Sequence, residues 1–229
     1  MVVDQKNQEE FKLNYKLYTM ARDLGPKCKL CKREGVKLML KGERCLMSKC
    51  AMTRKGDSQK TNKTTGGRSR SSDYNTQLRE KQKTKRIYHL LENQFKLTFL
   101  KASKQKGDVG ENLMKLLETR LDNVIFRLSL GSSRNQARQL VSHRHFTVNN
   151  KIVNIPSYQV KSNDIIKIKK SSLNNKQFSK IIDKLKKANI PSWLNFDIQE
   201  MIAKILHQPN KEDFEQGINT QRIVEFYSR

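Results

Sequence analysis

Four cysteines near the start of the chain have the residue type and the spacing of a metal site. Cys28 and Cys31 are two residues apart, Cys45 and Cys50 are four apart, and thirteen residues separate the pairs. Two close pairs joined by such a loop suit tetrahedral zinc, which thiolates bind at about 2.3 Å. Disulfides are the alternative, and they require an oxidising compartment. No apolar signal-peptide core precedes the cysteines, so we expect one structural zinc ion in a closed site without a hydrolytic role.

The chain as a whole is strongly basic. It has 47 Lys and Arg residues against 22 Asp and Glu, a formal net charge of +25. A polyanion such as RNA is the expected partner, because each phosphate that a cation neutralises releases condensed counterions. An anionic membrane is the alternative, but no apolar run approaches the ~18 residues of a spanning helix. We therefore expect no membrane partner and no small-molecule substrate.

The positive charge is unevenly distributed along the chain. Residues 51–72 hold six bases and one acid, and residues 79–106 hold nine bases and two acids. Residues 191–229 reverse the sign, with six acids and four bases, and they contain the only tryptophan, Trp193. The middle of the chain is therefore expected to meet the polyanion, and the tail is expected to pack against protein.

The elements that must position these residues follow from periodicity and turn signals. Residues 54–72 are mostly Lys, Arg, Gly, Ser, Thr and Asn, which predicts a basic linker without a core. Helices are expected at 72–86 and at about 92–104, where apolar residues recur at helical spacing. A further helix after residue 110 is predicted by one apolar stripe, made of Leu113, Leu117, Leu121, Val124 and Leu128.

A short helix and a small sheet are predicted next. Ser133, followed three residues later by Gln136, is a capping box that predicts a helix start at Ser133. After residue 145 the apolar period changes to two, with a turn at 149–150 and a later strand at 166–168. The expected fold class is α+β: a zinc knuckle and a mostly helical domain, with an inserted module of two helices packed on a short antiparallel sheet.

Cationic groups are expected to converge on the start of this short helix. Helix N-termini present unpaired amide donors and a partial positive charge, which favour phosphate. The convergent groups are Arg120, Arg127, Arg134, Arg138, His143, Arg144, His145 and Lys151. Together they predict a surface for the backbone of a folded RNA, with Arg134 and Arg138 projecting from the helix. A solvated helix face is the alternative for each single arginine, and hydrogen-bonded structural residues are the alternative for the two histidines.

Several segments, in the same order, resemble the family of small-subunit ribosomal protein four. They are RLDNVIFR from Arg120, SRNQARQLVSHRH from Ser133, VNNK from Val148, CKLCKREGVKLMLKGERC from Cys28, and shorter matches at 72–83, 155–160 and 225–229. The likeness covers about residues 20–229, and its cysteine segment resembles the zinc-bearing bacterial form. Arg144 and Asn150 depart from the family, which usually has glycine at both positions.

The resemblance implies a structural ribosomal protein that binds small-subunit ribosomal RNA directly, nucleates subunit assembly and contributes to decoding accuracy. It also implies contacts with small-subunit ribosomal proteins three and five, and a position near the messenger RNA entry channel. The residues expected to contact RNA, including those already named, are Lys29, Arg33, Arg44, Lys49, Arg68, Arg70, Tyr74, Arg79, Lys83, Arg86, Arg120, Arg127, Ser133, Arg134, Gln136, Arg138, His143, Arg144, His145, Asn149, Lys151, Ser157 and Lys161.

The expected organisation has four parts. Residues 1–19 form an N-terminal extension, and residues 20–110 form the zinc knuckle, the basic linker and a helical RNA-binding region. The small RNA-binding module occupies 111–172. A helical C-terminal segment and tail, 173–229, is expected to pack on the first domain.

Two other classes of protein share the small module. Pseudouridine synthases and a tyrosine–tRNA ligase carry it beside a catalytic domain, but no stretch of that size remains here, so we expect no enzyme. A free-standing RNA-binding chaperone or ribosome-associated factor is the alternative function. The bacterial cytoplasm is the expected setting, with an organellar ribosome as the alternative.

Overall fold

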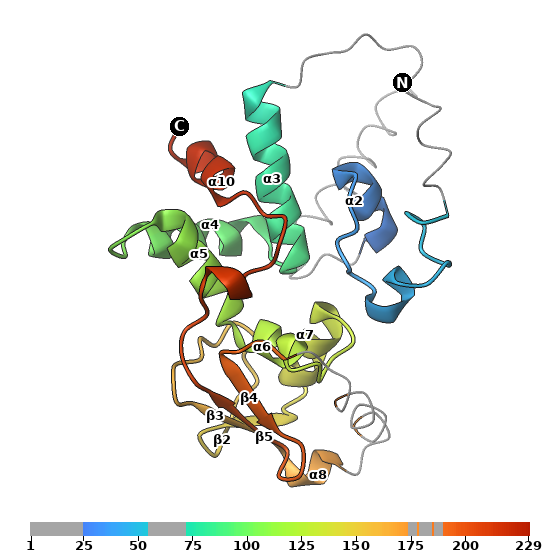
Figure 1. Cartoon of the computed structure of the whole chain (residues 1–229), viewed down its shortest axis with the longest axis vertical. Coiled ribbons are helices and arrows are strands. Elements are labelled where there is room, and N and C mark those ends of the chain that lie inside the picture. The colour runs from blue at the N-terminus through green and yellow to red at the C-terminus, as the bar shows by residue number, and fades with distance from the viewer. Residues whose placement is uncertain (1–24, 55–71, 174–177, 179–184, 186–189) are drawn as a thin grey trace, which may run out of the picture.

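The structure is a computed structural model that describes residues 25–54, 72–173, 178, 185 and 190–229. The extension predicted at 1–19 and most of the linker, including Arg68 and Arg70, lie outside the described residues. The described chain has a helical part and a part built on a sheet, with the knuckle beside the helices (Figure 1).

The helical part combines segments from both ends of the chain. Its elements are α2 (Lys27–Glu34) and the 3-10 helix η1 (Gly42–Cys45) of the knuckle, then α3 (Asp73–Ile87), α4 (Glu92–Ser103), α5 (Val109–Glu118) and α10 (Thr220–Tyr227). The helices predicted at 72–86 and 92–104 are confirmed as α3 and α4, and Ser72 caps α3 by accepting the amide of Asn75. Buried residues from these helices, such as Phe95, Leu113 and Ile223, share one core.

The apolar stripe after residue 110 belongs to two helices, and the prediction of one helix is wrong. α5 ends at Glu118 and α6 (Leu121–Arg127) begins after Arg120, whose backbone is extended. The break arises because the carbonyl of Thr119 accepts the amide of Val160 at 2.9 Å and the amide of Leu121 donates to Tyr158 at 2.8 Å. The stripe thereby passes from the helical core to the core of the module.

The start of α7 (Arg134–Ser142) confirms the predicted cap. The Ser133 side chain accepts the amide of Gln136 at 3.3 Å. The reciprocal half of the box is displaced by one residue, because the Gln136 side-chain oxygen accepts both the amide and the hydroxyl of Ser132. Gln136 therefore braces the loop before the helix.

The hairpin and its turn follow the prediction. β1 (Phe146–Val148) pairs with β2 (Lys151–Ile152), and Asn149 and Asn150 have φ of 49° and 66°. Both angles are left-handed, as a two-residue turn between strands requires, and asparagine tolerates them. Arg144 also has a positive φ of 62°, which explains why the resembling family favours glycine there.

The sheet is larger than predicted. Its strand order is β2-β1-β3-β5-β4 with antiparallel pairing throughout, where β3 is Ile165–Ile168, β4 is Leu194–Asp197 and β5 is Ile202–Ile205. The last two strands come from the segment predicted as helical and expected to pack on the first domain, so that prediction is corrected. Besides these strands, the described part of residues 170–229 contains α8 (Lys170–Leu173), η2 (Lys211–Asp213) and α10.

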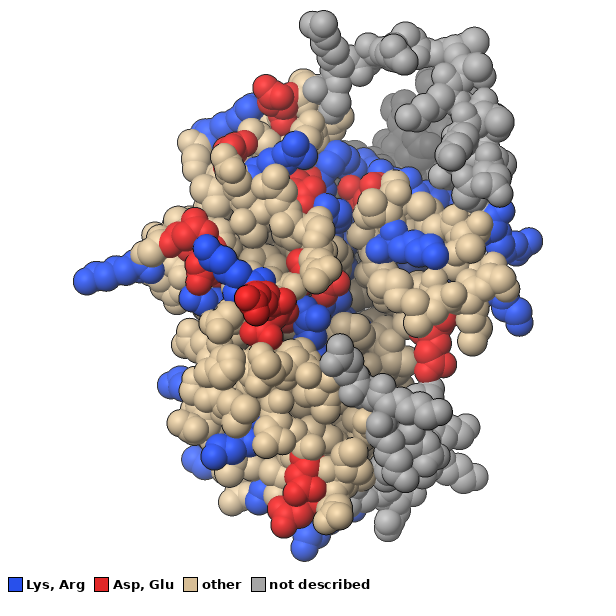
Figure 2. Space-filling view, viewed as in Figure 1, with Lys and Arg blue, Asp and Glu red and all other residues tan. Residues whose placement is uncertain are grey.

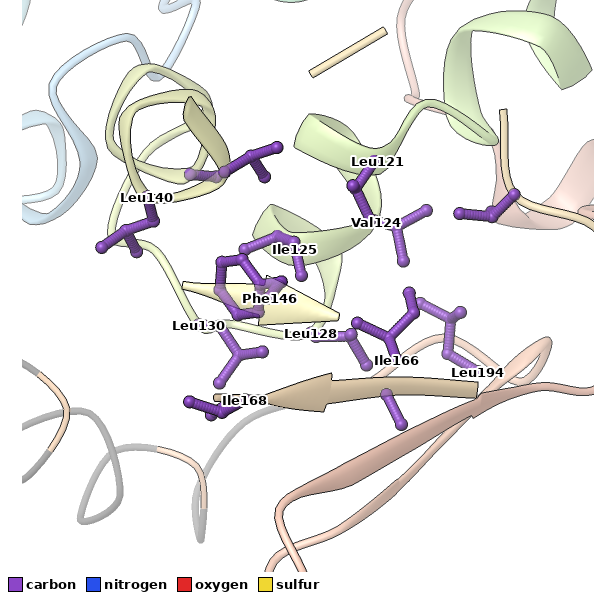
Figure 3. Packing of buried hydrophobic residues seen from close by; sticks show 14 of the residues in the cluster. Leu121, Val124, Ile125, Leu128, Leu130, Leu140, Phe146, Ile166, Ile168 and Leu194 are labelled. Atoms are coloured by element: carbon purple, nitrogen blue, oxygen red, sulfur yellow. The ribbon is translucent and has the colours of Figure 1, made fainter. Parts of the chain in front are cut away.

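The C-terminal segment contributes apolar residues to both hydrophobic cores. Trp193, Leu194 and Ile205 are buried with the module, where Leu194 lies close to Ile166 (Figure 3). Ile223 of α10 is buried with the helical part instead. No helix among the described residues is long and apolar enough to span a bilayer.

Candidate nucleic-acid interface and cysteine cluster

The four cysteines lie around one small pocket of the knuckle. Cys28 and Cys31 come from α2, Cys45 ends η1, and all four thiols line the pocket together with Leu40 and Met52. None of the four is in a disulfide. Within the described residues, no group of three or more Cys, His, Asp or Glu side chains is already placed to hold a metal ion.

The surroundings of the thiols favour a thiolate at one of them. A backbone hydrogen bond from Met52 lowers the pKa of Cys50, whereas burial raises the pKa of Cys31. The backbone amide of Lys41 also donates to the sulfur of Cys45 at 3.4 Å. Amide donors directed at sulfur are characteristic of thiolate sites, so the donor set fits a soft metal such as zinc.

The knuckle is attached to α3 by a buried carboxylate. The side chain of Glu34 is 2% exposed and forms ion pairs with Arg79, at 3.3 Å, and with Arg86. Both arginines were predicted to contact RNA, and in this structure each also has a carboxylate partner within the chain. Lys83, a further predicted contact, pairs with Glu80 at 2.7 Å.

The cations of the knuckle itself are exposed. Lys29, Arg33, Arg44 and Lys49 all lie on its surface. Lys and Arg side chains project from the knuckle at the right of the face seen in Figure 2. Tyr74, at the start of α3, is exposed as well, and its ring lies 5.7 Å from that of Phe226.

The predicted arginine cluster of the module is instead largely internal. Arg120 is 4% exposed and donates two hydrogen bonds, of 3.1 and 2.9 Å, to the carboxylate of Asp122. Arg138 reaches the same carboxylate at 3.4 Å. One buried aspartate therefore orients two of the four arginines.

Glu118 is the centre of a second network, at the junction of the two parts. Its carboxylate is completely buried and accepts from the Tyr88 hydroxyl at 2.6 Å, from the Asn123 amide at 2.6 Å and from Arg127 at 2.7 and 3.0 Å. Burial raises the pKa of this carboxyl, but the hydrogen bonds and the charge of Arg127 lower it by more, so the net pKa is lowered. Glu118 therefore remains charged at neutral pH.

Arg134 does not project from α7, and this part of the prediction is wrong. It is 7% exposed, donates to Asn123 at 2.8 Å and pairs with Glu215 at 2.5 Å. Its guanidinium also lies over the rings of Tyr88 and Phe126, at 4.9 and 4.5 Å from their centroids. Partners that are distant in the sequence draw the side chain inward.

The two histidines predicted to contact RNA, His143 and His145, differ in their surroundings. His145 bonds Ser172 at 2.9 Å and its ring meets that of Phe178 edge-on, which fits the structural alternative. Burial lowers the pKa of His145, whereas His143 is exposed. The remaining predicted contacts at the surface are Arg144, Asn149, Lys151, Ser157 and Lys161.

The acidic partners of the arginines were not among the residues predicted from the sequence. Glu118 follows directly after Leu117 of the apolar stripe, so its place at the edge of that stripe was the available signal. Glu215 and Glu34 gave no such signal, because each meets its arginine only through the tertiary fold.

Comparison with known proteins places the chain in a family. The model of the ribosomal protein S4/S9 N-terminal domain matches residues 22–118, and that of the S4 domain matches residues 119–166. Small ribosomal subunit protein uS4 of Heliobacterium modesticaldum is 48% identical over 210 residues, covering 92% of this chain and all of that protein. The uS4 of Caldicellulosiruptor saccharolyticus and the uS4A of Clostridium acetobutylicum are each 47% identical, with the same coverage of both chains. This chain belongs to the ribosomal protein uS4 family.

Proposed function

We propose that this protein is a structural constituent of the small ribosomal subunit and that it binds ribosomal RNA directly. The observation that carries the proposal is the match along the whole length of uS4 relatives, with both family domains in succession. The net charge of +25 supports a phosphate-rich partner. The protein is accordingly not an enzyme.

Sedimentation tests this proposal against a free-standing RNA chaperone. A structural constituent is present at one copy per small subunit in every growth condition, and it stays bound through a high-salt wash. A chaperone or ribosome-associated factor occupies only a fraction of subunits, and that fraction changes with conditions. Partial, condition-dependent occupancy would overturn the structural assignment.

The RNA-facing residues are proposed from exposure and charge. Exposed cations on the knuckle, together with Arg144, Lys151 and Lys161 on the module, have side chains that phosphate can reach. Arg127 and Arg138 keep part of their side chains accessible and remain proposed contacts. Arg120 and Arg134 are buried, so we propose that they support RNA binding by holding the module in place.

The four thiols are proposed to bind one structural zinc ion. The support is the shared pocket and the spacing of the two pairs. Cys28, Cys31, Cys45 and Cys50 would be its ligands, and the ion would contribute folding energy to the knuckle. Elemental analysis of the purified protein should give about one zinc per chain, as for a structural site. Zinc retained at that level after Cys28→Ser with Cys31→Ser would exclude the site.

Further partners are proposed from the family alone. These are small-subunit ribosomal proteins three and five, and messenger RNA near its entry channel, with roles in nucleating assembly and in decoding accuracy. The relatives are bacterial proteins, which favours a bacterial ribosome in the cytoplasm over an organellar one. Crosslinking within isolated small subunits would test the three partners separately.

A further inference from the structure

A glycine marks the place where the cysteine knuckle meets the module. Gly42, the first residue of η1, is buried and has φ of +57°. A Cβ added there would lie 2.9 Å from the carbonyl carbon of Ser132 and nearer still to the carbonyl oxygen. A side chain at this position would thus meet backbone, which cannot rotate away as a flexible side chain can.

The loop that Gly42 touches is itself firmly held. The amide and the hydroxyl of Ser132 both donate to Gln136 of α7, at 2.8 and 2.6 Å. A Cβ added at Gly131 would lie 2.9 Å from the backbone nitrogen of Ala137, so this loop already lies against α7. If bulk were added between the two segments, the knuckle would therefore be the part that moves.

The contact brings exposed cations of the knuckle toward the start of α7. Lys41 and Arg44 flank Gly42 closely in the sequence, and both side chains are exposed. Ser132, on the other side of the contact, is exposed and directly precedes the cap of α7. On the opposite side of the knuckle, the buried Glu34 ties α2 to α3. The knuckle is thus held between the two parts of the protein.

We propose that Gly42 is a positioning residue for RNA binding. It seats the knuckle on the loop before α7, so that the knuckle cations and the exposed module present one continuous surface to a single RNA backbone. This inference rests on the proposed function of the chain as an RNA-binding protein, and it concerns a residue that carries no charge and is itself buried.

The test compares Gly42→Ala with Gly35→Ala in the full-length protein. Gly35 has φ of +72°, and a Cβ added there meets nothing within 4 Å. Both substitutions place a Cβ on left-handed backbone and so carry similar local strain, but only Gly42→Ala adds the clash with Ser132. Equal metal content in the two variants would verify that both knuckles are folded.

Two measurements are made on each variant. Hydrogen exchange without RNA should show lost protection around residues 42–45 and 132–137 in Gly42→Ala, and wild-type protection at 132–137 in Gly35→Ala. Binding to a small-subunit ribosomal RNA fragment should weaken roughly ten- to thirty-fold at 0.15 M salt in Gly42→Ala. Its salt slope should fall by about two, as expected if Lys41 and Arg44 lose their phosphates.

A second pair of variants approaches the contact from the module. Ser132→Val adds bulk beside Gly42 and leaves the knuckle sequence intact, so it should reproduce the Gly42→Ala result, whereas Ser132→Ala adds none. The positioning role is overturned if the two glycine variants behave alike, or if protection is lost without a change in affinity and salt slope. If the wild-type protein does not prefer this RNA over an unrelated one, the proposed function is refuted instead. The hydrogen-exchange data would still show whether Gly42 holds the knuckle against the loop at Ser132.

Discussion

The arginines of the module and the cations of the knuckle occupy opposite environments. Arg120 and Arg134 are buried against the carboxylates of Asp122 and Glu215, whereas Arg44 and Lys49 are exposed. A buried charge must keep its partner, because the desolvation already incurred is not recovered when the partner is lost. An exposed cation can neutralise a phosphate without breaking an internal pair. We therefore expect the cations of this chain to serve two purposes, internal pairing and RNA binding, according to whether a carboxylate of the chain lies beside them.

The carboxylates of the chain also differ in burial. Glu118 is completely buried at the junction of the two parts and bonds four donors, two of them from Arg127. Glu111 lies seven residues earlier on α5, and its partly exposed side chain pairs with Lys115 at 2.7 Å and with Lys211 at 3.4 Å. The two residues share a helix and differ in burial, which makes them a matched pair.

Replacing Glu118 should lower the stability of the protein more than any other proposed substitution. Glu118→Gln leaves Arg127 without its buried counter-charge, so the free energy of unfolding should fall by about 3–5 kcal/mol. Glu111→Gln should leave the free energy of unfolding close to the wild-type value, because solvent screens the partly exposed pairs of Glu111. Urea denaturation of both variants measures the difference. Similar stabilities would show that the junction network has no special role.

The pH dependence of stability should identify the same carboxylate. The folded-state pKa of Glu118 is lowered, so its contribution is fully present above the unfolded value of about 4.3 and is lost as pH falls through the folded pKa. Between pH 5 and pH 2, Glu118→Gln should lose less stability than the wild-type protein does. Chemical denaturation at a series of pH values measures this. An unchanged pH dependence in Glu118→Gln would mean that another group controls acid unfolding.

The exposed cations should affect RNA binding without affecting stability. Arg44→Ala with Lys49→Ala should lower the salt slope of RNA binding by about two, because two phosphate contacts are lost. Their surface position predicts a stability change within about 0.5 kcal/mol. Titration of labelled RNA at several salt concentrations provides the slope. A fall in stability with an unchanged slope would reverse the assignment of the knuckle cations.

Local signals in the sequence were sufficient for the elements that local interactions determine. The cap at Ser133 and the Asn149-Asn150 turn are set by side chains and backbone angles within a few residues. β4 and β5 were missed because each is only four residues long, and so short an alternation is ambiguous until a neighbouring strand pairs with it. The break at Arg120 likewise depends on pairing with residues 158–160.

The candidate site was predicted less completely than the fold, for a related reason. The basic residues of the module were found by type, but their direction depends on partners far away in the sequence. Arg134 is drawn inward by Tyr88 and Glu215, which only the tertiary fold brings together. The cations predicted around α7 are therefore present there, and some of them, such as Arg134, form ion pairs that join the helical part to the module.

The division of labour between the two groups of cations is tested most directly by comparing Arg134→Ala with Arg44→Ala. Thermal unfolding and the salt slope of RNA binding would be measured on both proteins. Arg134→Ala should lower stability by roughly 2–3 kcal/mol and leave the slope unchanged, because it removes an internal ion pair and two cation–π contacts. Arg44→Ala should leave stability unchanged and lower the slope by about one. Arg134→Lys, which keeps the charge, provides a milder variant if Arg134→Ala does not fold. A reduced salt slope at full stability in either Arg134 variant would show that Arg134 contacts RNA phosphate and does not stabilise the fold.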